Sequence, residues 1–299
     1  MHTPYDGSNR PFTIGLRQLD LKDWIETDRY LDVYLAEKRR LYREERGNVL
    51  AFEPGSEAAQ AEVLDLLVEH LCRTRPDVYR CQPRKIDVLE GRFVVDLDDK
   101  SLPPLARAAL LVQEDLVIMG KRGADWHFVA ASLCFPSSWT LTEKIGKPMH
   151  EVHAPVPDFN AGTRNAGLIA RMFDNLNPER SVMRWNWSLY GNERLYHPPA
   201  GHEPGRRFGT GDIRGRVFMR LERQTLRKLP KTGDILFTIR IYIHPLEALQ
   251  THPEGPALAL AMEEQLLAMT PGQLDYKCLT HERETLSARL QQIAIKPEK

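Results

Sequence analysis

Two histidines, three positions apart, are followed by two prolines in the stretch EKIGKPMHEVHAPVPDF, residues 143–159. Pro148 can begin a helical turn that places His150 and His153 on neighbouring parts of one face. The prolines then end the turn and hold the chain extended. An imidazole whose direction is fixed in this way suits an axial metal ligand. The alternative, more common for such a pair taken alone, is that the histidines cap carbonyls or lie at the surface.

A second candidate segment is SVMRWNWSLYGNERLY, residues 181–196. If it is a strand, Trp185 and Trp187 share one face, and Arg184, Asn186 and Ser188 share the other. We expect the tryptophans to pack in the core rather than stack on a cofactor. The polar face can contact a ligand, or it can be a solvated face of an amphipathic strand.

Three charged residues interrupt β-type runs farther along the chain. Glu222 and Arg223 lie in LERQTLRKL, and Arg240 lies in FTIRIYIH. Charges in central strands are costly to bury unless they are paired or bound to a ligand. These residues therefore belong to a site, or Glu222 and Arg240 form a cross-strand salt bridge on a wet face.

The surrounding pattern predicts an α+β fold. Two hairpins, within residues 116–135 and 216–245, are expected to form one antiparallel sheet with residues 182–190. Helical periodicity predicts helices over the ranges 20–47, 56–75, 105–112, 257–269 and 282–294, with the first two outside the sheet. A capping box at Thr140-Leu-Thr-Glu143 predicts a further short helix that ends near Gly146.

Composition narrows the class of protein. The 41 Lys and Arg residues balance the 41 Asp and Glu residues, so no global field favours nucleic acid or an anionic membrane. The first residues lack the apolar run of a secretory signal, and no stretch is long enough to span a bilayer, so we expect a cytoplasmic protein. The cysteines show no Cys-x-x-Cys pair and are expected to be buried free thiols: Cys72, Cys81, Cys134 and Cys278.

Three segments together resemble the α subunit of the haem-dependent oxidative N-demethylases. They are PSSWTLTEKIGKPMHEVHAPVPDF, RWNWSL and LERQTLRKLPKTGDILFTIRIYI, in this order. The resemblance implies one haem-binding domain over residues 1–299, with its core at about 80–250. In that domain a PAS-like antiparallel sheet carries flanking helices and helical additions at both ends. It also implies haem b, and oxidation of a small secondary amine by O2 with electrons from a separate reductase.

The resemblance assigns roles to the candidate residues. His153 matches the family pattern His-x-Pro-Val-Pro and is expected to be the proximal iron ligand, oriented by Glu151 or a backbone oxygen; His150 is the second choice. Arg184 and Asn186 are expected to contact the cofactor.

The charged residues of the β-type runs are expected at the catalytic side of the haem. Arg223 is the first choice and Arg240 the second for polarising bound oxygen or holding a propionate, with Glu222 beside them. No Gly-x-Gly-x-x-Gly motif is present, so we expect neither a flavin nor a nicotinamide site in this chain. A haem-binding sensor or carrier, and a relative that has lost haem, are the alternatives. The Gly-rich residues 201–215 form either a lid or a surface loop.

Overall fold

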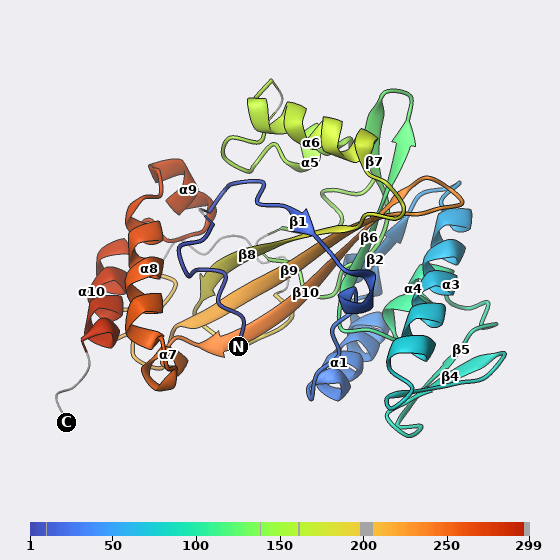
Figure 1. The fold of residues 1–299 in the computed structure, drawn as a ribbon, viewed down its shortest axis with the longest axis horizontal. Coiled ribbons are helices and arrows are strands. Elements are labelled where there is room, and N and C mark those ends of the chain that lie inside the picture. The colour runs from blue at the N-terminus through green and yellow to red at the C-terminus, as the bar shows by residue number, and fades with distance from the viewer. Residues whose placement is uncertain (10, 138, 161, 198–205, 296–299) are drawn as a thin grey trace.

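An antiparallel sheet runs through the centre of the protein (Figure 1). The computed structural model describes residues 1–9, 11–137, 139–160, 162–197 and 206–295. Within these ranges the sheet has seven strands in the order β1-β8-β9-β10-β6-β7-β2. The strands are β1 (Arg17–Gln18), β2 (Leu50–Phe52), β6 (Asp115–Arg122), β7 (Asp125–Ser132), β8 (Val182–Tyr190), β9 (Phe218–Lys228) and β10 (Ile235–Pro245). The α+β class and the joining of both hairpins with residues 182–190 in one sheet are confirmed.

Glycine turns and a helix contact fix the register of the two hairpins. Gly123 and Gly233 adopt φ values of 61° and 78°, a region that glycine enters without steric cost. At the β9–β10 turn the carboxylate of Glu62 accepts the backbone N–H groups of Lys231 and Thr232, at 2.7 and 2.9 Å. The turn is therefore tied to the helix that carries Glu62.

Helices cover both faces of the sheet (Figure 1). They are α1 (Leu31–Glu44), α2 (Arg46–Val49), α3 (Glu57–Thr74), α4 (Pro104–Ala109), α5 (Met149–Val152), α6 (Arg164–Asn175), α7 (Ala248–Thr251), α8 (Gly255–Leu267), α9 (Pro271–Tyr276) and α10 (Arg283–Ala294). Along β6, Leu116 and Ile118 pack in the cluster with α3 and α4, whereas Val117 and Met119 pack in the cluster with α6. This alternation places α5 and α6 over one face and α3 and α4 over the other. The last helices pack against the end of β8 and β9.

A small second sheet contains β3 (Tyr79–Cys81), β4 (Lys85–Val88) and β5 (Phe93–Asp96). It was not among the expected elements. Its buried residues Tyr79, Ile86 and Val95 belong to the same apolar cluster as Leu116 and Ile118 of the large sheet. The two sheets therefore share one core.

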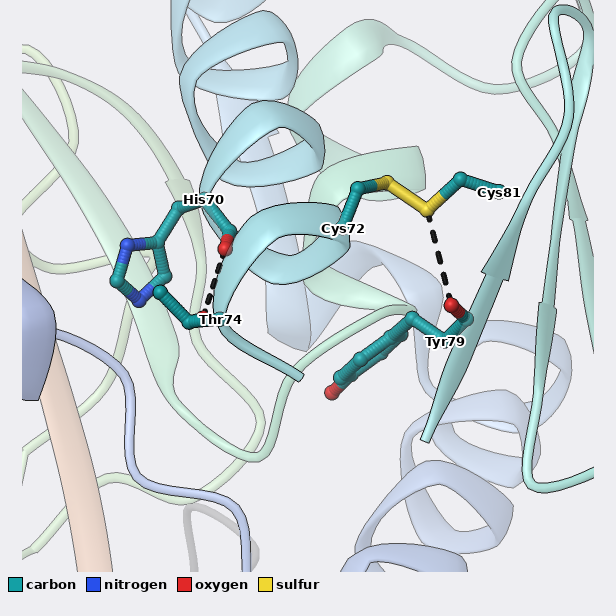
Figure 2. The surroundings of a disulfide bond; sticks show 5 residues. All are labelled: His70, Cys72, Thr74, Tyr79 and Cys81. Carbon is teal, nitrogen blue, oxygen red and sulfur yellow. Dashed lines mark hydrogen bonds between the residues drawn. A yellow bond between two sulfur atoms is a disulfide. The ribbon is translucent and has the colours of Figure 1, made fainter. Parts of the chain in front are cut away.

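A disulfide joins Cys72 near the end of α3 to Cys81 of β3 (Figure 2). The expectation that all four cysteines are free thiols is therefore wrong for this pair, because the chain folds β3 back along α3 and brings the two side chains together. Cys134 is free and buried, and Cys278 is free and partly buried. The bond anchors the small sheet to α3.

Two expected helices differ from the structure for identifiable reasons. The first helix begins at Leu31 rather than near residue 20, because the carbonyls of Asp23 and Trp24 accept hydrogen bonds from Arg223 instead of continuing a helix. The predicted helix at residues 140–146 is absent, and residues 142–146 form a turn instead. There the N–H of Gly146 bonds to the carbonyl of Phe128, so the segment follows β7.

Three of the described helices, α6, α7 and α9, were not expected from the sequence. No helix among the described residues is long and apolar enough to cross a membrane.

Candidate functional site

A cleft lies between the sheet and the helices α5 and α6. Its cavity volume is about 240 Å³. Strands β6 to β10 form one wall, α5 and α6 a second, and residues 12–16 of the N-terminal segment a third. Most of the lining is apolar, and it includes Met119, Phe128, Phe159, Phe173, Leu226 and Ile239. Such a cleft, with a few polar groups, is the usual form of a small-molecule site.

His153 is one of the polar groups in this cleft. It follows the last residue of the short helix α5, which begins at Met149 with Pro148 as its N-cap, one residue later than the sequence predicted. Its Nδ1 atom lies 3.1 Å from the carbonyl oxygen of Met149. A carbonyl only accepts, so Nδ1 carries the proton and Nε2 carries the lone pair.

The charge state of His153 suits metal ligation. Burial lowers its pKa to about 4, helped by the positive charges of Lys144 and Arg184 and opposed by the bond to Met149. The imidazole is therefore neutral at pH 7, the form that binds metal ions. The backbone carbonyl of Met149, rather than Glu151, orients the ring.

His150 lies outside the cleft walls. Its side chain is exposed, and its Nε2 atom is 4.0 Å from Oε1 of Glu151. The sequence predicted both histidines on neighbouring parts of one face. In the structure the four-residue helix turns His150 to the surface and His153 into the cleft, so a shared site for the two is wrong.

The alternation predicted for β8 is confirmed. Arg184, Asn186 and Ser188 line the cleft. On the opposite face, Trp187 is buried in the core near Tyr5, while Trp185 contacts the rings of His2 and Tyr242.

Arg184 places a positive charge on the cleft wall. Burial lowers its pKa, and the charge of Glu222 opposes that effect. Its Nε atom is buried, and no described residue accepts a hydrogen bond from it. A buried guanidinium nitrogen without an acceptor favours an anionic group in the cleft.

Glu222 faces the same cleft from β9. Its Oε2 atom accepts hydrogen bonds from Asn186 Nδ2 at 3.2 Å and from Gln224 Nε2 at 2.7 Å. Both of these donors use the same oxygen, and none of the hydrogen bonds among described residues uses Oε1. Oε1 can therefore accept a proton or a hydrogen bond from a ligand.

Two lysines also line the cleft, and sequence reasoning missed both of them. Lys277 follows α9 and is buried, and its Nζ atom lies 2.6 Å from the carbonyl oxygen of Trp187. Lys144 donates to the carbonyl of Val152. Burial lowers the pKa of each lysine to about 8. Neither lysine stands in a sequence pattern that distinguishes it from a surface lysine.

Arg223 and Arg240 lie on the other face of the sheet. Register pairs Arg240 with Arg223 and Ile241 with Glu222, so the arginines point away from the cleft and from Glu222. The Nε atom of Arg223 is 2.9 Å from Oε1 of Glu26. The expectation that either arginine faces the same pocket as His153 is wrong, and so is the alternative of a salt bridge between Glu222 and Arg240.

Arg240 is held on that face in a similar way. Its guanidinium is 2.8 Å from Oδ2 of Asp28, and it lies 4.3 Å from the centroid of the Tyr34 ring. The N-terminal segment therefore supplies the partners that these charges need. Both arginines are structural in this arrangement.

The family relationship follows from a match over nearly the whole chain. A family model described as haem-dependent oxidative N-demethylase, alpha subunit-like, matches residues 15–287. The chain belongs to this family. The match covers the residues that line the cleft from Leu16 to Lys277, including both His153 and Glu222, while Phe12 and Ile14 precede it.

Haem dependence, which the name of the N-demethylase family implies, can be tested against the cleft. Haem needs an axial donor, apolar walls and cationic partners for its propionates. His153 offers the donor, the aromatic and aliphatic lining offers the walls, and Arg184 and Lys144 offer positive charge. The described residues contain no group of three or more His, Cys, Asp or Glu side chains that could hold a bare metal ion. Haem iron, whose equatorial ligands come from the macrocycle, needs only axial protein donors, and the residues present fit it.

The Gly-rich segment expected at residues 201–215 lies partly outside the described residues, since 201–205 are not described. Its described part, residues 206–215, contains turns and contributes no wall to the cleft.

Proposed function

We propose that this chain is a haem b-dependent oxidoreductase that demethylates a small secondary amine with O2 and electrons from a separate reductase. One observation carries the proposal. A single apolar cleft contains a neutral imidazole with a free Nε2 lone pair and a carboxylate with a free oxygen, Glu222 Oε1. The first suits iron and the second suits an amine.

His153 would hold the haem through Nε2, with Met149 fixing the ring. Arg184 and Lys144 line the cleft and would supply positive charge to the propionates. When bound, the haem would supply the centre at which O2 is activated and electrons are received. Residues 1–299 would act as one PAS-like haem-binding domain.

Glu222 would bind the amine. A small secondary amine is protonated at pH 7, so it would reach the cleft as an ammonium ion that can donate to Oε1 of Glu222. Asn186 and Gln224 hold the other oxygen and thereby fix the direction of the carboxylate. A proton transferred from nitrogen to Oε1 would leave the amine lone pair free. The apolar walls exclude water and suit its methyl groups.

The electrons must come from another protein in this proposal. The description of the family as alpha subunit-like supports a partner subunit, and the sequence carries no dinucleotide motif. We also propose that the protein is cytoplasmic.

A sensor or carrier on the same scaffold is the second candidate. It would need His153 and the apolar walls, but it would not need a carboxylate held by two side-chain amides beside them. Glu222 therefore favours the enzyme.

An absorption spectrum of the purified chain tests the cofactor. We expect a Soret band that shifts on reduction and again with carbon monoxide. A protein that stays colourless after haem addition would remove the proposal. Amine-dependent consumption of reductant then separates the enzyme from a carrier, which would bind haem and consume none.

A further inference from the structure

Lys277 connects the C-terminal helices to the wall of the cleft. It follows α9, and its Nζ atom lies 2.6 Å from the carbonyl oxygen of Trp187 and 3.5 Å from Oδ1 of Asn186. The ammonium group also lies 5.1 Å from the centroid of the Phe12 ring. Lys277 is buried, with only 5% of its surface exposed. It nevertheless forms no ion pair with a carboxylate of any described residue. A buried ammonium without a carboxylate is costly, so a function for this charge is expected.

The contact with Asn186 determines which way its amide points. An ammonium group can only donate, so the amide oxygen faces Lys277. The amide nitrogen then faces Glu222, where Nδ2 lies 3.2 Å from Oε2. If the amide flipped, Nδ2 would meet the ammonium group and Oδ1 would meet the carboxylate, and both contacts would be repulsive. Lys277 and Glu222 therefore favour the same orientation, in which Asn186 donates to Glu222.

We infer that Lys277 is a positioning residue, which acts through Asn186 to hold Oε2 of Glu222 and so presents Oε1 to an ammonium ion. This rests on the proposed function, since it concerns the same amine site. It makes the C-terminal helices part of the site, although they contribute only Tyr276 and Lys277 to the described walls.

The electrostatics of the site agree with this geometry. Burial lowers the pKa of Lys277 to about 8, the charge of Glu222 raises it, and the charges of Arg184 and Arg207 lower it further. The lysine is therefore still mostly charged at pH 7. The residue differs in this way from Gln224, which holds the same carboxylate without any charge.

The test compares Lys277→Met with Lys231→Met in the haem-loaded full chain. Lys231 is a matched control because its side chain is 73% exposed and lies at the β9–β10 turn. Binding of dimethylamine, the smallest secondary amine, is followed by the shift of the Soret band. We expect Lys277→Met to retain haem and to bind the amine about 10- to 100-fold more weakly, the usual effect of losing an outer partner of a site, while Lys231→Met changes nothing.

A double variant shows whether the effect passes through Asn186. In an Asn186→Leu background, Lys277→Met should cause no further loss, because the intermediate group is already gone. The inference would be overturned if the losses of amine affinity in the two single variants simply add in the double variant. It would also be overturned if Lys277→Met binds the amine as tightly as the native chain does. If Lys277→Met does not fold, Lys277→Gln is expected to fold and to show a smaller loss, since it keeps a donor; native affinity in that variant counts against the role.

A spectroscopic readout separates this inference from the proposed function. The side-chain amide signal of Asn186, assigned by its absence in Asn186→Asp, should shift in Lys277→Met by nuclear magnetic resonance, with or without amine. A native chain that binds no amine would remove the proposed function, while the amide signal would still decide whether Lys277 orients Asn186. An unchanged signal would show that it does not.

Discussion

The Nδ1 atom of His153 lies 3.1 Å from the carbonyl oxygen of Met149, four residues earlier in the chain. One helical turn therefore supplies both the imidazole and the group that fixes its tautomer. Metal-binding histidines commonly have such a partner, which keeps the lone pair aimed at the metal. The neighbouring histidine, His150, is exposed and has no equivalent contact with a described residue.

Replacing His153 by Ala should remove the haem or change its spin state, because the nitrogen proposed to bind the iron would be lost. Absorbance per protein molecule and the position of the Soret band measure this. His150→Ala is the matched control and should keep native haem content. If His150→Ala loses haem and His153→Ala does not, the iron ligand is His150.

Acid should destabilise the haem-free protein between about pH 6.5 and pH 4. The pKa of His153 is lowered to about 4 in the folded chain, whereas an unfolded imidazole titrates near 6.5. In this window the unfolded chain binds a proton that the folded chain does not, so the free energy of unfolding falls as the pH falls. The upper bound is about 1.4 kcal/mol for each unit of pKa shift.

Urea unfolding at several pH values measures this slope. The pKa values of His70 and His197 are also lowered to about 4 by burial, and they contribute in the same direction. His153→Gln should flatten the slope without abolishing it. A slope identical to that of the native chain would contradict a buried neutral His153.

Replacing Glu222 by Gln should weaken binding of a small secondary amine while haem content stays native. The substitution removes the charge that an ammonium ion would meet, and charge-assisted hydrogen bonds are worth about 1.5–3 kcal/mol, or roughly 10- to 150-fold. Gln224→Leu is a useful comparison because it removes a donor to Glu222 and keeps the charge. Its effect should be smaller.

Arg223→Leu should cost stability rather than change the haem spectrum. The guanidinium is buried and is paired with Glu26 at 2.9 Å, and breaking a buried pair costs up to about 3–5 kcal/mol. Arg184→Leu is the control on the other face, and it should lower haem retention more than stability. A changed spectrum in folded Arg223→Leu, with native stability, would return this arginine to the site.

Thiol titration of the unfolded protein should find two free thiols before reduction and four after it, because Cys72 and Cys81 are joined. The protein for this titration should be purified from a reducing cytoplasm. Four free thiols before reduction would show that Cys72 and Cys81 are not joined in that compartment.

The sequence predicted the sheet well because both hairpins and β8 have strong local patterns. Alternation in β8 was enough to separate Trp185 and Trp187 from Arg184 and Asn186. Alternation did not place Arg223 and Arg240 correctly. A charged residue inside a strand indicates that a partner is needed, but it does not indicate on which face of the sheet that partner lies. Their partners, Glu26 and Asp28, lie about 200 residues earlier in the chain.

The other residues of the site depended on distant packing. Lys277 reaches the cleft only because the C-terminal helices pack against β8, and nothing near it in sequence indicates this. The disulfide was missed for the same reason, since the sequence alone does not show that β3 returns along α3.

Because the two faces of β8 differ, an insertion or deletion in this strand and a substitution in it should have different effects. A strand alternates with a period of two, so a shift by one residue exchanges its faces. Deleting one residue early in β8 would turn Trp185 and Trp187 into the cleft and bury Arg184, Asn186 and Ser188 against the core around Tyr5 and Leu266. Substitutions on either face can be accommodated one at a time, but a single insertion or deletion would alter both faces together. We therefore expect the length of this strand to be less free to vary than the identity of any residue in it.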